Sequence, residues 1–304
     1  MLSKDFIARV QNKLARESHR SLKRFYHLKN SRDIQKRIMF VMGCQRSGTT
    51  LMMHILEKDY ATSIYHEQSV LSSGDKVERL RLNSLAFVKK VLTRDRAQFI
   101  VLKPLVESQR TTELLDFFPN SKALWMYRSY HDVVNSNLKR FGMRNGIDDI
   151  RPIAQDDSNN WRSAGASAQV RAFVQEHFAE DMNPYDAGAL FWYARNNLYF
   201  EQNLTQNPHV MLCNYRDLAL KPLHFMQELY HFMEQDFPGP HIVADVKDSS
   251  VGRGKHVELS PDIEAACADL YARMDAAYAA TEQYRRIHAD EETETGQVPA
   301  TVSC

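Results

Sequence analysis

The octapeptide Gly43–Thr50, GCQRSGTT, combines residue types that can hold an anion, and it follows the apolar run Ile38–Met42. A strand that enters a glycine turn and then a helix directs backbone N–H groups and the positive end of the helix dipole at one point. The glycine spacing matches the G-x-x-x-x-G-K-[ST] loop for the phosphates of ATP, but Thr49 replaces the lysine and Arg46 lies within the loop. The loop therefore predicts a site for a phosphoric anhydride other than ATP.

A second group of polar and cationic residues follows the apolar run 123–127. Arg128 comes directly after this predicted strand, and Ser136 and Arg140 lie one turn apart on the helix that should follow. An arginine can bind a phosphate through two parallel hydrogen bonds. We therefore expect these three side chains to hold a second phosphate.

The loop GCQRSGTT resembles the 5′-phosphosulfate loop of the sulfotransferases. These enzymes use 3′-phosphoadenosine 5′-phosphosulfate (PAPS) as sulfonate donor and release adenosine 3′,5′-bisphosphate (PAP). An arginine in this loop is typical of the tyrosylprotein sulfotransferases and of many bacterial relatives. The resemblance runs from residue 36 to residue 275 or so, and it implies that the phosphosulfate contacts Gly43, Arg46, Ser47, Gly48, Thr49 and Thr50.

The segment from Arg128 to Ser136 resembles the 3′-phosphate motif of the family. Arg140 follows on the same predicted helix, as it does in the tyrosylprotein branch. The segment Ser249–Lys255, SSVGRGK, resembles the C-terminal loop that closes over the nucleotide. The resemblance implies that the cations of this loop, Arg253 and Lys255, touch the 3′-phosphate.

The run VMLCN followed by Tyr215 resembles the strand of the family that ends in Tyr-Glu-Asp-Leu, although Arg216 replaces the usual glutamate. By this resemblance Tyr215 lies near the adenine. A tyrosine packed in the core is the alternative.

Lys103 ends the apolar run 99–102 and resembles the strand-terminal lysine of the family. Together with Arg46 it would stabilise the charge that builds on the leaving phosphate. A sulfonate carries less charge than a terminal phosphoryl group, so positive side chains can take the role that magnesium has in kinases.

The four cysteines and twelve histidines are scattered, and they predict no metal site.

The acceptor must lose a proton, and the segment Tyr65–Ser69 resembles the Gly-Glu-Glu segment that supplies the base in the tyrosylprotein branch. We expect Glu67 to be this base, with His66 as the second candidate and Glu107 as the third. The histidine that cytosolic members carry shortly after the strand-terminal lysine is absent. As an alternative, Glu67 is only an ion-pair partner of Arg46.

Short apolar runs alternate with helical patterns along the chain. This alternation predicts a single α/β domain of three layers, with a central parallel sheet flanked by helices as in the P-loop NTPases. The segment 141–165 is polar and is predicted to be a long loop. The predicted strands are 38–42, 99–102, 123–127 and 210–213, and the predicted helices are 49–58, 75–92, 107–117, 131–140, 186–205 and 218–234.

The chain of 304 residues divides into three predicted parts: a basic N-terminal helical arm (1–35), a sulfotransferase domain (36–285) and an acidic tail (286–304) that we expect to be disordered. The net charge of +1 gives no sign of nucleic-acid binding. Without an apolar segment long enough to span a bilayer, or a signal-like start, we expect a cytoplasmic protein. The arm is either a solvated surface helix or a peripheral contact with an anionic membrane or an acidic acceptor.

We therefore predict a PAPS-dependent sulfotransferase that acts on a hydroxyl of a carbohydrate, a lipid or a small metabolite. The acceptor pocket is expected from segments 68–95, 141–185 and 236–248, in which no motif names a substrate. A P-loop kinase of a nucleoside or small metabolite is the alternative enzyme. A binding module without catalysis, acting through the basic arm, is the third hypothesis.

Overall fold

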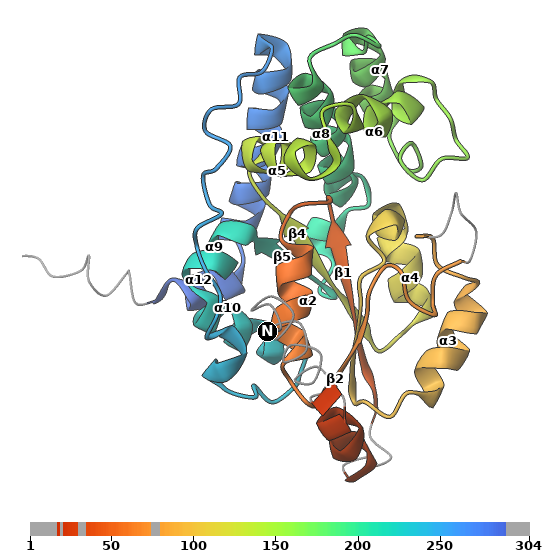
Figure 1. Cartoon of the computed structure of the whole chain (residues 1–304), viewed down its shortest axis with the longest axis vertical. Coiled ribbons are helices and arrows are strands. Elements are labelled where there is room, and N and C mark those ends of the chain that lie inside the picture. The colour runs from red at the N-terminus through yellow and green to blue at the C-terminus, as the bar shows by residue number, and fades with distance from the viewer. Residues whose placement is uncertain (1–16, 19–20, 30–34, 74–79, 290–304) are drawn as a thin grey trace, which may run out of the picture.

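The computed structural model describes residues 17–18, 21–29, 35–73 and 80–289. Its centre is one parallel sheet of five strands in the order β2-β3-β1-β4-β5 (Figure 1). The strands are β1 (Arg37–Gly43), β2 (Thr62–Tyr65), β3 (Phe99–Leu102), β4 (Ser121–Tyr127) and β5 (Val210–Asn214). The predicted fold class and all four predicted strands are confirmed, whereas the sequence analysis missed the edge strand β2.

Both faces of the sheet are buried, which explains why its central strands are continuous apolar runs. Alternate residues of β1 point to opposite faces, so that Phe40 and Met42 join one apolar cluster while Met39 and Val41 join the other. The cluster with Met39 and Val41 includes residues of α2 (Thr49–Glu57), α9 (Tyr215–Leu220) and α10 (Pro222–Phe232). The cluster with Phe40 and Met42 includes residues of seven other helices. These are α3 (Leu85–Arg94), α4 (Thr111–Phe117), α5 (Tyr130–Phe141), α6 (Asn145–Ala154), α7 (Ala168–His177), α8 (Pro184–Glu201) and α11 (Pro261–Ala279).

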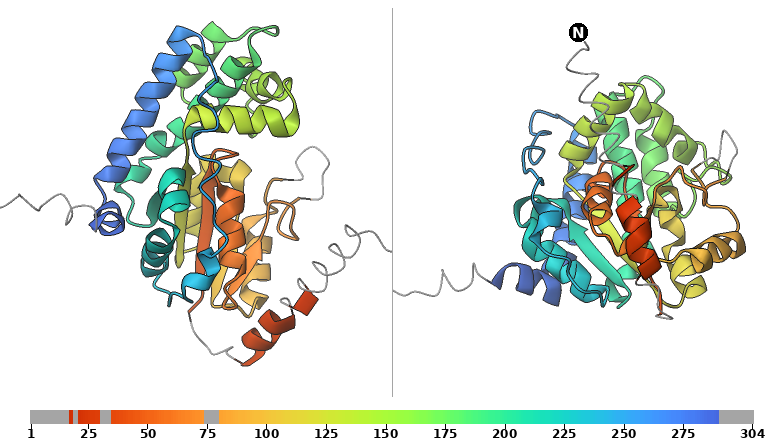
Figure 2. Two further views of the ribbon diagram at one scale, coloured as in Figure 1. Left: turned by 60° about the vertical axis from the view of Figure 1, so that its left-hand side comes forward. Right: turned by 60° about the horizontal axis from the view of Figure 1, so that its bottom comes forward.

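Helices α5, α6 and α7 lie beyond the carboxyl end of β1, together with part of α8 (Figure 1). The segment between α10 and α11 starts beside the end of α2, where Lys58 donates to Ile242 O, and it reaches α5 at Gly252 and Gly254 (Figure 2). Because binding sites of parallel sheets form at the carboxyl ends of the strands, these elements can build a site around the end of β1.

The prediction of a long loop over residues 141–165 is wrong, because helix α6 spans Asn145–Ala154. Ile147, Ile150 and Ile153 recur every three residues and are buried, and the helix packs on α8. Polar neighbours concealed this short apolar stripe. The sequence analysis also missed α7, α11 and α12 (Glu282–Ile287) as named helices.

Three predicted helices have different bounds in the structure. The range 218–234 contains two helices, α9 and α10, and Pro222 opens the second because proline suits a first helical turn. The range 75–92 begins outside the described residues, and α3 starts only after Ser84, whose Oγ accepts a hydrogen bond from Phe87 N. The range 107–117 starts as the 3-10 helix η1 (Leu105–Arg110) and continues as α4.

Most of the predicted basic arm lies outside the described residues. Its helical part 21–29 is attached to the domain by Lys23, whose Nζ donates to Thr62 O of β2 at 2.9 Å. Leu22, Phe25 and Leu28 of this helix are exposed. The membrane contact and the boundaries of the three parts stay predictions. Of the helices in the described ranges, none has the length and apolar character needed to cross a membrane.

Candidate active site

The loop between β1 and α2 has the shape of an anion cradle. Gly43 ends β1 with φ +117°, and a Cβ there would lie 2.2 Å from the backbone oxygen of Met126. Gly48 precedes α2 with φ +94°, and a Cβ there would lie 2.2 Å from the ring of Tyr215. Both positions therefore require glycine, since this backbone region and these close approaches exclude a side chain.

The cradle has donors left for a ligand. Gly48, the N-cap residue of α2, has no side chain that could cap the helix. The first backbone N–H groups of a helix have no intrahelical partner and can therefore bind a ligand. The Oγ of Ser47 is buried and has no hydrogen-bond partner in the described part of the chain. Because buried polar groups are normally paired, this set of donors fits an anion held at the helix N-terminus.

Three arginines converge on the same place. Arg46 lies in the loop with φ +66°, and its Nε donates to Ser136 Oγ at 3.1 Å. Burial lowers the pKa of Arg46, and the neighbouring positive charges of Arg140 and Arg128 lower it further. The structure thus brings together the predicted residues of the two phosphate motifs, and the mutual repulsion of their charges would be relieved by an anion.

Arg128 is held in place by contacts from three directions. Its Nη2 lies 3.1 Å from Asp132 Oδ2, its guanidinium lies 4.3 Å from the ring centre of Tyr215, and it also donates to Ser250 O. Tyr215 is buried but lies against Gly48 and Arg128, and its hydroxyl pairs with Ser250 Oγ. Tyr215 is therefore part of the site and not only of the core.

The segment 249–255 is fastened to α5 by its backbone. Asp132 accepts hydrogen bonds from Gly252 N at 2.9 Å and from Gly254 N at 2.6 Å. The side chains of Arg253 and Lys255 are exposed, and no contact places either of them on the arginine cluster in the described part of the chain. The sequence analysis missed Asp132 and Ser250; for Asp132 the available signal was a carboxylate one helical turn after Arg128.

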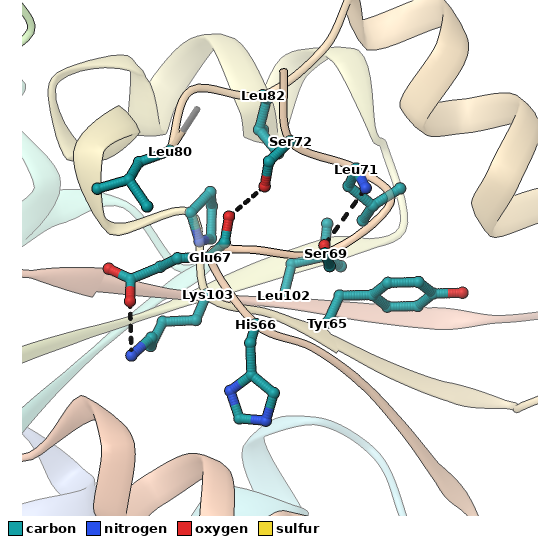
Figure 3. A pocket seen from close by; sticks show the side chains of 11 residues that line it. Tyr65, His66, Glu67, Ser69, Leu71, Ser72, Leu80, Leu82, Leu102 and Lys103 are labelled. Atoms are coloured by element: carbon teal, nitrogen blue, oxygen red, sulfur yellow. Dashed lines mark hydrogen bonds and ion pairs between the residues drawn. The ribbon is translucent and has the colours of Figure 1, made fainter. Parts of the chain in front are cut away.

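Lys103 and Glu67 meet beside the loop. Lys103 Nζ lies 3.0 Å from Glu67 Oε2 (Figure 3). The same Nζ donates to Thr50 Oγ1 at 3.3 Å. The carboxylate of Glu67 therefore pairs with Lys103 and not with Arg46. This contact links the cation at the end of β3 to the first turn of α2 and places a candidate base next to both.

The other two candidate bases are less suited. The ring of His66 points away from the carboxylate of Glu67 (Figure 3). Burial and the charge of Lys103 lower the pKa of His66. Glu107 is fully buried and is occupied by Arg81 at 2.8 Å and Arg110 at 3.2 Å.

Glu67 also lines a cavity of about 170 Å³. Gly43 and Gln45 of the loop form part of its wall, and Asp149 of α6 forms another part. Asp149 is buried and accepts hydrogen bonds from Gln45, Asn145 and Arg162 at 2.7, 2.7 and 2.8 Å. Of the predicted acceptor segments, 68–95 and 141–185 contribute to this wall, whereas 236–248 does not.

The site thus combines a cationic cradle, a carboxylate and a cavity at one edge of a parallel sheet, on a fold of the P-loop type. A family model described as the sulfotransferase domain matches residues 36–262. The chain belongs to this family.

The chain is also similar to solved structures. The sulfotransferase domain of the Synechococcus PCC 7002 olefin synthase superposes with a TM-score of 0.51 at 14% identity, covering 81% of this chain and 98% of that one. A sulfotransferase from Alicyclobacillus acidocaldarius has a TM-score of 0.46 at 14% identity, covering 81% and 96%. A comparison with curated protein sequences found no match.

Proposed function

We propose that the protein transfers a sulfonate group from PAPS to a hydroxyl of an acceptor bound in the cavity beside Glu67. The main support is the position of Glu67, which pairs with Lys103 at the phosphate loop and also lines the cavity. A group held by the loop and a hydroxyl in the cavity would therefore meet at one carboxylate.

The nucleotide would be held by residues of the described site. The backbone N–H groups of the loop, the Ser47 hydroxyl and Arg46 suit the phosphosulfate. Arg128, Ser136 and Arg140 suit the 3′-phosphate, since guanidinium groups bind phosphate in two-pronged fashion. The segment 249–255, fastened by Asp132, would cover the nucleotide next to Tyr215.

In the transfer, the acceptor oxygen forms a bond to sulfur while the bond from sulfur to the 5′-phosphate oxygen breaks. The acceptor proton passes to Glu67, and the electron pair of the broken bond stays on PAP. Lys103 and Arg46 stabilise the charge that develops on the leaving phosphate and on the sulfonate oxygens. Glu67 must first exchange its ion pair with Lys103 for a hydrogen bond to the acceptor.

Membership in the sulfotransferase family argues against the alternative of a P-loop kinase. Among the described residues, no group of three His, Cys, Asp or Glu side chains is arranged to hold a metal. Transfer without a metal and a cytoplasmic location remain predictions from the sequence.

Labelled transfer tests this proposal. Incubation of the full chain with ³⁵S-labelled PAPS, EDTA and fractionated cell extract is expected to label a hydroxyl-bearing compound and release PAP. The same extract with the Lys103→Met variant should show labelling reduced by about 10²-fold, since a single oriented donor in such sites contributes roughly that much. Transfer that appears only after magnesium is added would contradict the mechanism.

A further inference from the structure

Arg195 of α8 is a buried guanidinium at the wall of the cavity, and it has no carboxylate partner among the described residues. It is 2% exposed. Its hydrogen bonds go to neutral oxygens only, and all are long: to Gln109 Oε1 at 3.3 and 3.4 Å, to Trp161 O at 3.4 Å and to Leu105 O at 3.4 Å. Such contacts orient the group without neutralising it.

Three other arginines, of which Arg162 also lines the cavity, have carboxylate partners. Arg162 has Asp149 at 2.8 Å, Arg81 has Glu107 at 2.8 Å, and Arg110 shares Glu107. Arg195 thus differs from its neighbours, although it is the most deeply buried of them. A buried charge without a counter-ion is costly for a protein to maintain.

The charge of Arg195 and an unpaired donor beside it favour the binding of an anion. Burial lowers the pKa of Arg195 to about 10, so the group still carries its charge at neutral pH. The Nε2 of Gln109, whose Oε1 contacts Arg195, is a buried donor without a partner in the described part of the chain. An anion bound in the cavity would give the guanidinium of Arg195 the counter-charge that it lacks.

Part of the cavity wall is aromatic, although Glu67 and Asp149 also line it. Trp161 lies over the guanidinium of Arg195 at 5.4 Å, and Phe191 and Phe141 contribute two more rings. The volume of about 170 Å³ is close to the roughly 150 Å³ of a cavity that holds one benzene molecule. The cavity therefore has about the volume needed for a ligand with one aromatic ring.

We propose that the acceptor is a hydroxy acid with a flat apolar body, whose carboxylate is bound by Arg195 while its hydroxyl faces Glu67. This inference rests on the proposed sulfotransferase function and narrows its acceptor class. Arg195 acts in it as a specificity-determining residue, because a neutral acceptor of the same shape would leave its charge unpaired.

A pair of probes tests the inference on the full chain loaded with PAP. 4-Hydroxybenzoate and 4-hydroxybenzamide have nearly the same shape, but only the first is an anion at neutral pH. Titration calorimetry is expected to show binding of the acid at least about tenfold tighter, since hydrogen bonds to a charged group contribute about 1.5–3 kcal/mol. This comparison needs no variant.

Variants then assign the preference to Arg195. Arg195→Met should remove the preference for the acid, and Arg195→Lys should retain part of it. Arg273→Met, which removes an exposed positive charge on α11, is the matched control and should bind like the wild type. Affinity for PAP should be the same in all four proteins, which also reports whether each variant is folded.

Equal affinities for the two probes, or no binding of either, would overturn the inference. So would an Arg195→Met protein that binds PAP normally and still prefers the acid. Failure of PAP itself to bind the wild type would instead refute the proposed function, so the two failures are distinguishable.

Discussion

Glu67→Gln should lower kcat for sulfonate transfer by about 10²–10⁴-fold, the usual contribution of a positioned general base. The amide keeps the shape of the side chain and can still accept a hydrogen bond from Lys103, but it cannot take the acceptor proton. The affinity for PAP should be unchanged, because the loop and the arginine cluster remain intact. Single-turnover transfer from labelled PAPS measures the chemical step directly.

Two variants make this result specific. Glu282→Gln removes an exposed carboxylate at the start of α12 and is the matched control, with activity expected to equal that of the wild type. His66→Gln tests the competing base. Full activity of Glu67→Gln together with loss of activity in His66→Gln would transfer the role to His66. Unchanged transfer in both variants would show that neither side chain is the base.

Arg128→Met is expected to weaken PAP binding by about 10²-fold, because a charged two-pronged contact to a phosphate is worth roughly 3 kcal/mol. The loss should fall on the 3′-phosphate alone. Adenosine 5′-phosphate lacks this group and should bind the variant as it binds the wild type. Calorimetry with both nucleotides gives the ratio, and Arg216→Met, which removes an exposed positive charge on α9, is the control.

Arg128 also contacts Ser250 and Tyr215, so it could act on nucleotide binding without touching the 3′-phosphate. If PAP and adenosine 5′-phosphate weaken equally, Arg128 acts by holding the segment 249–255 in place. The assignment of the 3′-phosphate to the cluster of Arg128, Ser136 and Arg140 would then be wrong.

The sheet could be predicted from the sequence because strands buried on both faces are continuous apolar runs, as in β1 and β3. The strand β2 could not, because its four residues at the sheet edge are mostly only half-buried. Helix α6 was missed for a related reason, since its buried isoleucines form a stripe only one residue wide among polar neighbours. The pairing of such weak segments is decided by tertiary contacts.

The site was predictable where a local motif carries its chemistry. The residues of the loop, and those that follow β4, lie within a few positions of one another in the sequence, so they could be singled out as a candidate site. Contacts between distant segments could not: the pair Glu67–Lys103, the support of Gly252 and Gly254 by Asp132, and the unpaired charge of Arg195 all depend on how the chain folds back.

The most direct test of the account is titration calorimetry of the full chain with PAP in the presence of EDTA, compared with ATP in the presence of magnesium. The cationic cradle of Arg46, Arg128 and Arg140 predicts tight binding of PAP without a metal and little or no binding of Mg-ATP. Tight binding of Mg-ATP, with PAP binding absent or dependent on magnesium, would contradict the account.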